Sequence, residues 1–195
     1  MYLQTTVQPT TEPVAVDDVK ARLRLTTTAD DVTIAGQITQ AREFAEKVSR
    51  RSLAYKSYSG FLDRFPFPHE PIRMPVPPIV SVTAIKFYDS TLTQQTWDPT
   101  EYWVASAQSP ALIVPIPGLI YPPTASVPGA VEVDFAAGWG YPGAPASGGT
   151  PAIPAGPALP SDWQRSIQDV AVFIYEHPGE PIPEALVQIP KVYVF

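Results

Sequence analysis

The feature that most limits the fold of this sequence is the position of its helical patterns relative to its prolines. Proline accounts for 25 of the 195 residues, well over twice its usual share of about 5%. Each proline fixes φ and removes a backbone donor, so it favours turns, sheet edges and extended arms over helix interiors and central strands. Two amphipathic patterns precede the proline-rich centre and a third follows it, so we expect helices at both ends and short strands between them.

Three segments carry apolar residues at helical spacing. The first covers residues 13–24, the second runs from Asp30 to about Arg50, and the third begins after Pro160 and stops at His177. Acidic residues stand near the start of each segment, and basic residues close the first two, as the helix dipole favours. The sequence therefore predicts three helices.

Strand patterns fill the region 53–137. Apolar and polar residues alternate at 80–84 and 131–135, which indicates half-buried strands. Proline pairs at 77–78 and 122–123 keep the strands short. Weaker strand candidates lie at 54–62, 71–74, 101–105 and 111–114.

These segments together predict an α+β fold. We expect a small bundle of two N-terminal helices and one C-terminal helix, beside a short-stranded antiparallel or mixed β region with extended Pro-rich arms. We expect one domain over residues 1–195 with the following parts: an N-terminal arm 1–12, a helical pair 13–52, a β region 53–137, a Gly/Pro-rich loop 138–160, a helix 161–177 and a C-terminal tail 178–195.

Composition excludes several classes of function. The net charge of −6 argues against a nucleic-acid-binding surface, which needs clustered Lys and Arg to neutralise phosphates. The absence of cysteine rules out disulfides, thiolate metal sites and a Cys nucleophile. No apolar run reaches the roughly 20 residues of a membrane span, and residues 1–11 lack the features of a signal peptide. We therefore expect an intracellular, soluble protein.

Residues suited to catalysis or metal binding are scarce. A two-His metal site with a carboxylate could use His69 and His177, but a turn histidine and a helix-end histidine explain them more simply. The doublets 17–18 and 30–31 could pair carboxylates for catalysis or Mg²⁺, yet acidic residues are expected at helix starts. No phosphate-loop, dinucleotide, zincin or hydrolase motif occurs. We predict no enzyme activity, no catalytic residue, no metal and no cofactor.

Basic residues gather in the helical pair and form one candidate partner interface. They are either a solvated helix face or a surface that meets an acidic neighbour. The residues that we select for this interface are Arg42, Lys47, Arg50 and Arg51.

Aromatic and apolar residues supply further candidates. Core packing is the simpler explanation for Trp97, Tyr102, Trp103 and Trp163, with an inter-subunit contact as the alternative for the first three. The tail from residue 181 onward could bind a partner in extended form or fold over its own core. The remaining interface candidates are Trp139, Tyr141, Val192, Tyr193, Val194 and Phe195.

Several stretches, taken in order, resemble the phage head–tail connector family of tailed phages and gene transfer agents. They are "VAVDDVKARLRL", "ADDVTIAGQITQAREFAEKVSRRSL", "IRMPVPPIVSVTAIKFYD", "VEVDFAAGWGYP" and "ALPSDWQRSIQDVAVFIYEH". Arg51, Ser52 and Leu53 match the basic-small-Leu turn that ends the long helix in that family. The resemblance covers roughly residues 14–177. The loop 138–160 is richer in Gly and Pro than the family pattern, and the end of the last helix departs from it.

The resemblance implies a non-enzymatic virion protein made in the host cytoplasm and placed in the neck between head and tail. Its partners would be the portal protein, a tail or stopper protein and other copies of itself in a ring, usually dodecameric. Double-stranded DNA would pass through the ring without specific binding, and an acidic wall suits such passage. Two alternatives remain: another tail-completion or stopper protein, which would be mostly β, and a small metal-dependent hydrolase.

Overall fold

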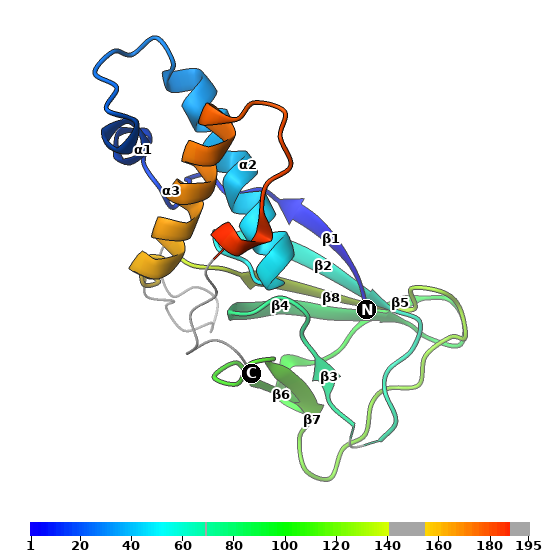
Figure 1. The fold of residues 1–195 in the computed structure, drawn as a ribbon. Helices are drawn as coiled ribbons and strands as arrows, with labels where there is room; N and C mark the ends of the chain where they lie inside the picture. The colour runs from blue at the N-terminus through cyan, green and yellow to red at the C-terminus, as the bar shows by residue number, and fades with distance from the viewer. Residues whose placement is uncertain (69, 141–154, 188–195) are drawn as a thin grey trace. The chain divides into compact units, whose positions relative to one another are not determined.

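The computed structural model describes residues 1–68, 70–140 and 155–187. Its contacts divide the chain into two compact units, each built from two separate segments (Figure 1). The β unit comprises residues 1–8 and 55–138; the helical unit comprises residues 9–54 and the described residues from 139 onward. Helices and antiparallel sheets both occur, so the predicted α+β class is confirmed.

Two antiparallel sheets form the β unit. The larger has five strands in the order β1-β2-β8-β4-β5, and the smaller has three in the order β3-β7-β6. The strands are β1 (Tyr2–Val7), β2 (Lys56–Leu62), β3 (Ile72–Arg73), β4 (Ile79–Tyr88), β5 (Gln94–Thr96), β6 (Tyr102–Ala105), β7 (Leu112–Pro115) and β8 (Val131–Ala137), with a 3₁₀ turn η1 (Pro99–Glu101) before β6.

The central strand β8 shows how the sequence pattern becomes a core. Val131, Val133 and Phe135 are at most 1% exposed, whereas Glu132 and Asp134 alternate with them and stay partly exposed. This is the period-two alternation of a strand with one buried face. The buried face shares one apolar core with residues of the smaller sheet, such as Ile113.

The sequence prediction found most strands but missed two. Every predicted strand segment contains an observed strand. β1 lies inside the predicted N-terminal arm, and its residues pair with β2 from Tyr2 opposite Phe61 to Val7 opposite Ser57. β5 has only three residues, too few to carry a periodic signal. Both strands form because a longer neighbour offers its free edge.

The helical unit contains the three predicted helices. They are α1 (Val16–Leu23), α2 (Asp31–Ser49) and α3 (Ser161–Glu176), followed by a short 3₁₀ turn η2 (Glu184–Leu186). α2 and α3 bury apolar stripes in one common core, with Ile34 and Ile38 from α2 and Trp163 and Ile167 from α3 at no more than 1% exposure. This confirms that the three helices bundle together. None of the helices among the described residues is long and apolar enough to span a membrane.

The first part of the predicted tail packs on the helical unit. Val187 is 6% exposed, and Ile182 and Leu186 contact the same core. The described segment up to residue 187 therefore folds over its own helices, as one of the two readings of the tail predicted. Residues 188–195 lie outside the described residues.

Candidate interaction surfaces

Lys47 and Arg50 form an exposed basic group at the C-terminal end of α2, next to the half-buried Arg51. Arg50 ends the helix with a left-handed backbone, φ 54°. Cations are favoured at this end because the last carbonyls of the helix carry partial negative charge. The position of these residues leaves Lys47 and Arg50 accessible to an acidic partner.

Arg42 is grouped with these residues in the sequence prediction, but the structure places it inside the helical unit. Its side chain is 2% exposed, with Nε 2.8 Å from Glu12 Oε2 and Nη1 2.8 Å from Glu46 Oε2. Burial would lower the pKa of Arg42, but the hydrogen bond that it donates to Glu12 and the charges of Glu46 and Glu12 raise that pKa above its ordinary value. We therefore assign Arg42 an internal role and leave it out of the interface proposed below.

Glu46 connects this buried ion pair to the chain that follows α2. Its Oε1 accepts a hydrogen bond from the backbone N–H of Leu53 at 2.9 Å, while its other oxygen holds Arg42. Glu12, Arg42, Glu46 and Leu53 thus join three parts of the helical unit. The spacing of charges in the sequence gives no sign of this network, because Glu12 lies thirty residues from Arg42.

The other predicted interface residues are placed only in part. Trp139 is half-buried against the helical core. Tyr141, Val192, Tyr193, Val194 and Phe195 lie outside the described residues. Of the aromatic residues expected in the core, Trp97 and Tyr102 are buried at 2% and 9% exposure, whereas Trp103 is 64% exposed.

The larger sheet carries a polar cluster that sequence reasoning missed. Lys86 Nζ lies 2.6 Å from Asp134 Oδ2, and the hydroxyl of Ser59 donates to Asp134 Oδ1. Burial would raise the pKa of Asp134, but the hydrogen bonds from Lys86 and Ser59 outweigh it and hold that pKa below its usual value. The three residues come from β4, β8 and β2, so only the strand order brings them together.

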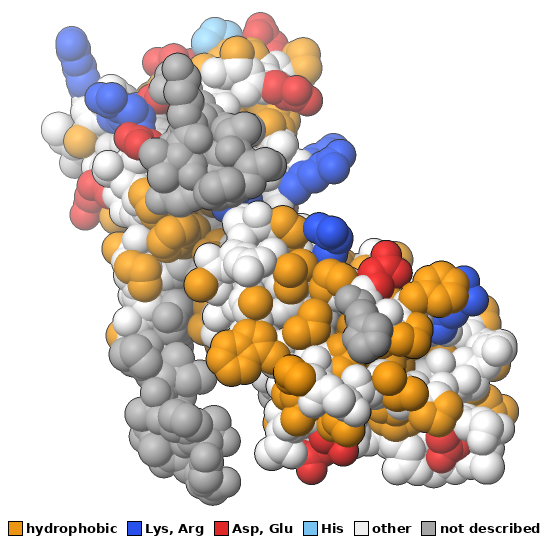
Figure 2. Space-filling model, turned by 90° about the horizontal axis from the view of Figure 1, so that it is seen from below, with side chains coloured by type: hydrophobic (Ala, Val, Ile, Leu, Met, Phe, Trp, Pro, Cys, Tyr) orange, Lys and Arg blue, Asp and Glu red, His pale blue; other side chains and the backbone are white. Residues whose placement is uncertain are grey.

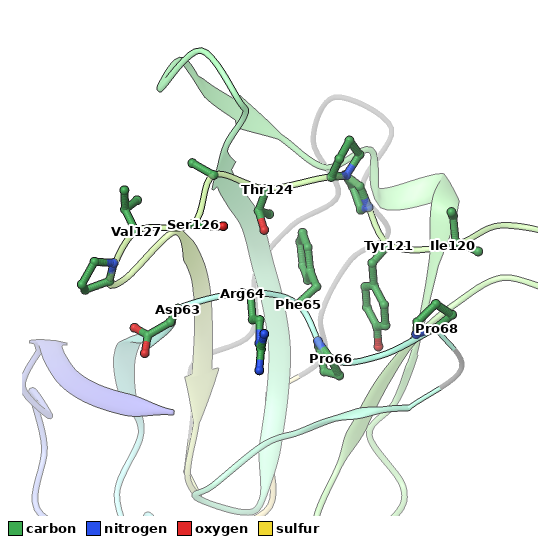
Figure 3. A pocket seen from close by; sticks show the side chains of 14 residues that line it. Asp63, Arg64, Phe65, Pro66, Pro68, Ile120, Tyr121, Thr124, Ser126 and Val127 are labelled. Carbon is green, nitrogen blue, oxygen red and sulfur yellow. The ribbon is translucent and has the colours of Figure 1, made fainter.

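An open hollow of about 630 Å³ lies between the segments 63–68 and 120–128 of the β unit. Figure 3 shows the rings of Phe65 and Tyr121 side by side, and their centroids are 5.0 Å apart. Burial raises the pKa of Tyr121 to about 12, and its hydroxyl donates to the carbonyl of Glu70 at 2.7 Å. Asp63 accepts from the N–H of Gly129. The hollow thus has prolines and aromatic rings along its walls, with Asp63 and Arg64 as its charged lining residues.

Exposed apolar side chains gather near this hollow and on the smaller sheet. Phe67, Ile120 and Trp103 are 71%, 66% and 64% exposed, and Figure 2 shows apolar side chains spread over this face of the β unit. Arg64 lies over the ring of Phe67 at 5.9 Å. Apolar patches of this kind on soluble proteins mark contact surfaces for other proteins.

The described residues contain no cluster of three or more His, Asp or Glu side chains that could hold a metal ion. His177 ends α3 and stacks on Phe173 with ring centroids 4.6 Å apart. His69 lies outside the described residues.

This protein belongs to the α+β class, because it combines an antiparallel β unit with a three-helix unit. Both units carry candidate contact surfaces. Within that class, residues 14–91 match the model of the phage gp6-like head-tail connector protein family. This segment runs from just before α1 through β4, and the match confirms the resemblance to phage head–tail connectors read from the sequence.

Solved structures extend the likeness of fold to nearly the whole chain. One chain in the neck of an empty gene transfer agent particle, computed with C6 symmetry, superposes with a TM-score of 0.74 at 18% identity, covering 94% of this chain and 88% of that one. A chain from the virion of a native gene transfer agent gives a TM-score of 0.70 at 20% identity, with 96% and 93% covered. A chain from the neck of a native particle, computed with C12 symmetry, gives 0.70 at 17% identity with the same coverage. No match was found among the curated proteins.

Proposed function

We propose that this chain is a head–tail connector, a non-enzymatic structural protein in the neck of a phage or gene transfer agent particle. The observation that carries the proposal is the family match over residues 14–91 together with a fold likeness to neck chains that covers more than nine-tenths of this chain.

The proposed role has three parts. Copies of the chain form a ring that binds the portal ring. The opposite side of the ring receives the stopper or tail, and its lumen extends the DNA channel. A dodecamer fits the C12 symmetry of one of the similar neck structures. The net charge of −6 suits a wall past which DNA slides, because an acidic surface repels phosphates.

Two alternative functions have less support. A stopper or tail-completion protein was expected to be mostly β, whereas this chain has a helical unit with its own core. A metal-dependent hydrolase needs a set of ligands that the described residues do not supply.

Lys47 and Arg50, with Arg51 beside them, are the proposed basic contact of the helical unit with an acidic partner surface. We expect the double substitution Lys47→Glu and Arg50→Glu to weaken attachment to purified portal rings roughly tenfold, because reversing two rim charges costs on the order of 1.4 kcal/mol. The measurement is co-sedimentation with portal rings over a range of salt concentrations, since screening should shrink the difference.

A matched control reverses two other exposed arginines of the helical unit, Arg24 and Arg165. The control keeps the same net charge change, so it should leave attachment within twofold of the wild type. Equal loss in both variants would mean that net charge, and not the end of α2, governs binding.

A further inference from the structure

Both edges of the five-stranded sheet are open in the described structure. β1 and β5 are the outermost strands, and no other described strand pairs with their outer sides. All residues of β5 are exposed, and all of β1 except the half-buried Leu3. An edge strand leaves every second pair of backbone N–H and C=O groups free to pair with another chain.

The two edges are only partly protected: β5 is three residues long and the register of β1 shifts between Thr5 and Val7, but neither strand has the stronger blocks of charge or proline. Charged side chains and prolines normally block edge-to-edge pairing. The two strands read Tyr-Leu-Gln-Thr-Thr-Val and Gln-Gln-Thr, without a charged residue or a proline. Their side chains are mostly polar and uncharged, so the edges tolerate water in the free subunit and offer no repulsion to a second strand.

We propose that β1 of one copy pairs with β5 of the next copy, so that the larger sheets join around the ring. The inference rests on the proposed ring and names the contact that closes it. A cyclic ring needs two different surfaces on opposite sides of each subunit. The two edges of one sheet meet this requirement, since they face in opposite directions and are separated by four strand spacings, about 19 Å.

The strand directions fix the kind of junction. Each neighbouring pair in the five-stranded sheet is antiparallel, so β1 and β5 run in the same direction. The rotation that relates neighbouring copies, about 30° in a dodecamer, turns a strand by no more than that angle, so the junction of β5 with the next β1 is parallel. A two-fold dimer would instead pair two β1 strands in antiparallel directions. Crosslinking that detects which strands meet can therefore distinguish the two assemblies.

The register identifies a pair of positions for the test. Gln4 lies opposite Ser59, which lies opposite Asp134; Thr96 lies opposite Lys86, which lies opposite Glu132. Asp134 and Glu132 are two residues apart on β8, so Gln4 and Thr96 are on the same face of the sheet. The proposed junction would bring these two positions together on one face of the joined sheets.

The absence of cysteine from the chain allows a direct crosslinking test. Particles carrying the double variant Gln4→Cys and Thr96→Cys are treated with a short bismaleimide and analysed on denaturing gels. We expect a ladder of covalent oligomers that ends at the ring's copy number. Crosslinking within one subunit cannot produce it, since the two positions lie at opposite edges of the sheet. Gln4→Cys alone, Thr96→Cys alone and the control pair Gln4→Cys with Ser126→Cys, whose second site lies in an exposed loop, should give no ladder.

A second set of variants tests the same contact without chemistry. Lysine at both Gln4 and Thr96 places like charges beside each other at each junction, whereas Gln4→Lys with Thr96→Glu places opposite charges there. We expect incorporation into particles to fall several-fold in the first variant and to recover in the second. Equal incorporation of both, or recovery in neither, would overturn the inference.

The copy number of the wild-type chain separates this inference from the proposed function. If the chain is present in ring number and the double-cysteine variant gives no ladder, or if Gln4→Cys alone gives dimers, the edge junction is wrong and the connector role stands. If the wild-type chain is missing from particles, the connector role fails and the junction with it.

Discussion

Replacing Arg42 with methionine should destabilise the helical unit by about 3–5 kcal/mol, the usual cost of removing one partner from a buried ion pair. The guanidinium is 2% exposed and bridges Glu12 and Glu46. Methionine fills a similar length but leaves Glu12 and Glu46 without their cation. The free energy of unfolding from urea titrations, followed by circular dichroism at 222 nm, measures the loss.

A matched arginine on the surface of the same unit provides the control. Arg22 pairs with Asp169 on α3, but both side chains are about one-third exposed, and exposed ion pairs contribute at most about 1 kcal/mol. Arg22→Met should therefore cost no more than that. If the two substitutions cost the same, the internal role assigned to Arg42 is wrong.

Replacing Trp163 with alanine should lower the free energy of unfolding by about 3–5 kcal/mol, the usual range for buried aromatic residues. Trp163 is fully buried in the first turn of α3, within the core that α3 shares with α2. Removing the indole leaves a cavity that helices held by several other apolar contacts cannot fill by relaxing. The same urea titration should show a lower midpoint.

Trp103 provides a control with the same chemical change in the β unit. Its side chain is 64% exposed on β6, so Trp103→Ala should change the stability by less than about 0.5 kcal/mol. A loss at Trp103 as large as that at Trp163 would contradict the assignment of the two residues to surface and core.

The helices could be predicted from the sequence because their evidence is local. In α2, apolar residues recur at helical spacing, Asp30 and Asp31 open the helix, and Arg50 ends it. The observed bounds, Asp31–Ser49, differ from the predicted ones by one residue at each end. The alternation in β8 is equally local, since one face of that strand is buried along its whole length.

The two edge strands could not be predicted in the same way. Five of the six residues of β1 are exposed. The strand therefore has no buried face, and its sequence lacks the alternation of apolar and polar residues that would reveal a strand. It forms through backbone pairing with β2, more than fifty residues later in the chain. The proposed ring contact depends on these two strands, and it could therefore be argued only once the sheet order was known.

The exposure of the candidate interface residues could be predicted only where it depends on local sequence. Lys47 and Arg50 are exposed as expected for a contact surface, because a helix end is accessible in most folds. Arg42 differs because it directly follows Ala41 and lies three residues before Ala45, both on the buried face of the helix, and Glu12 supplies the charge that allows its burial. Whether any of these residues contacts the portal stays a prediction.

The measurement that tests the central proposal most directly is the copy number of this chain in purified particles. Quantitative mass spectrometry against the portal and the major capsid protein gives the ratio without requiring that the ring assemble alone. We predict one ring's worth of this chain per particle, equal to the copy number of the portal if the ring is a dodecamer. Hundreds of copies would make the chain a capsid or tail-tube component, and none would contradict the connector function.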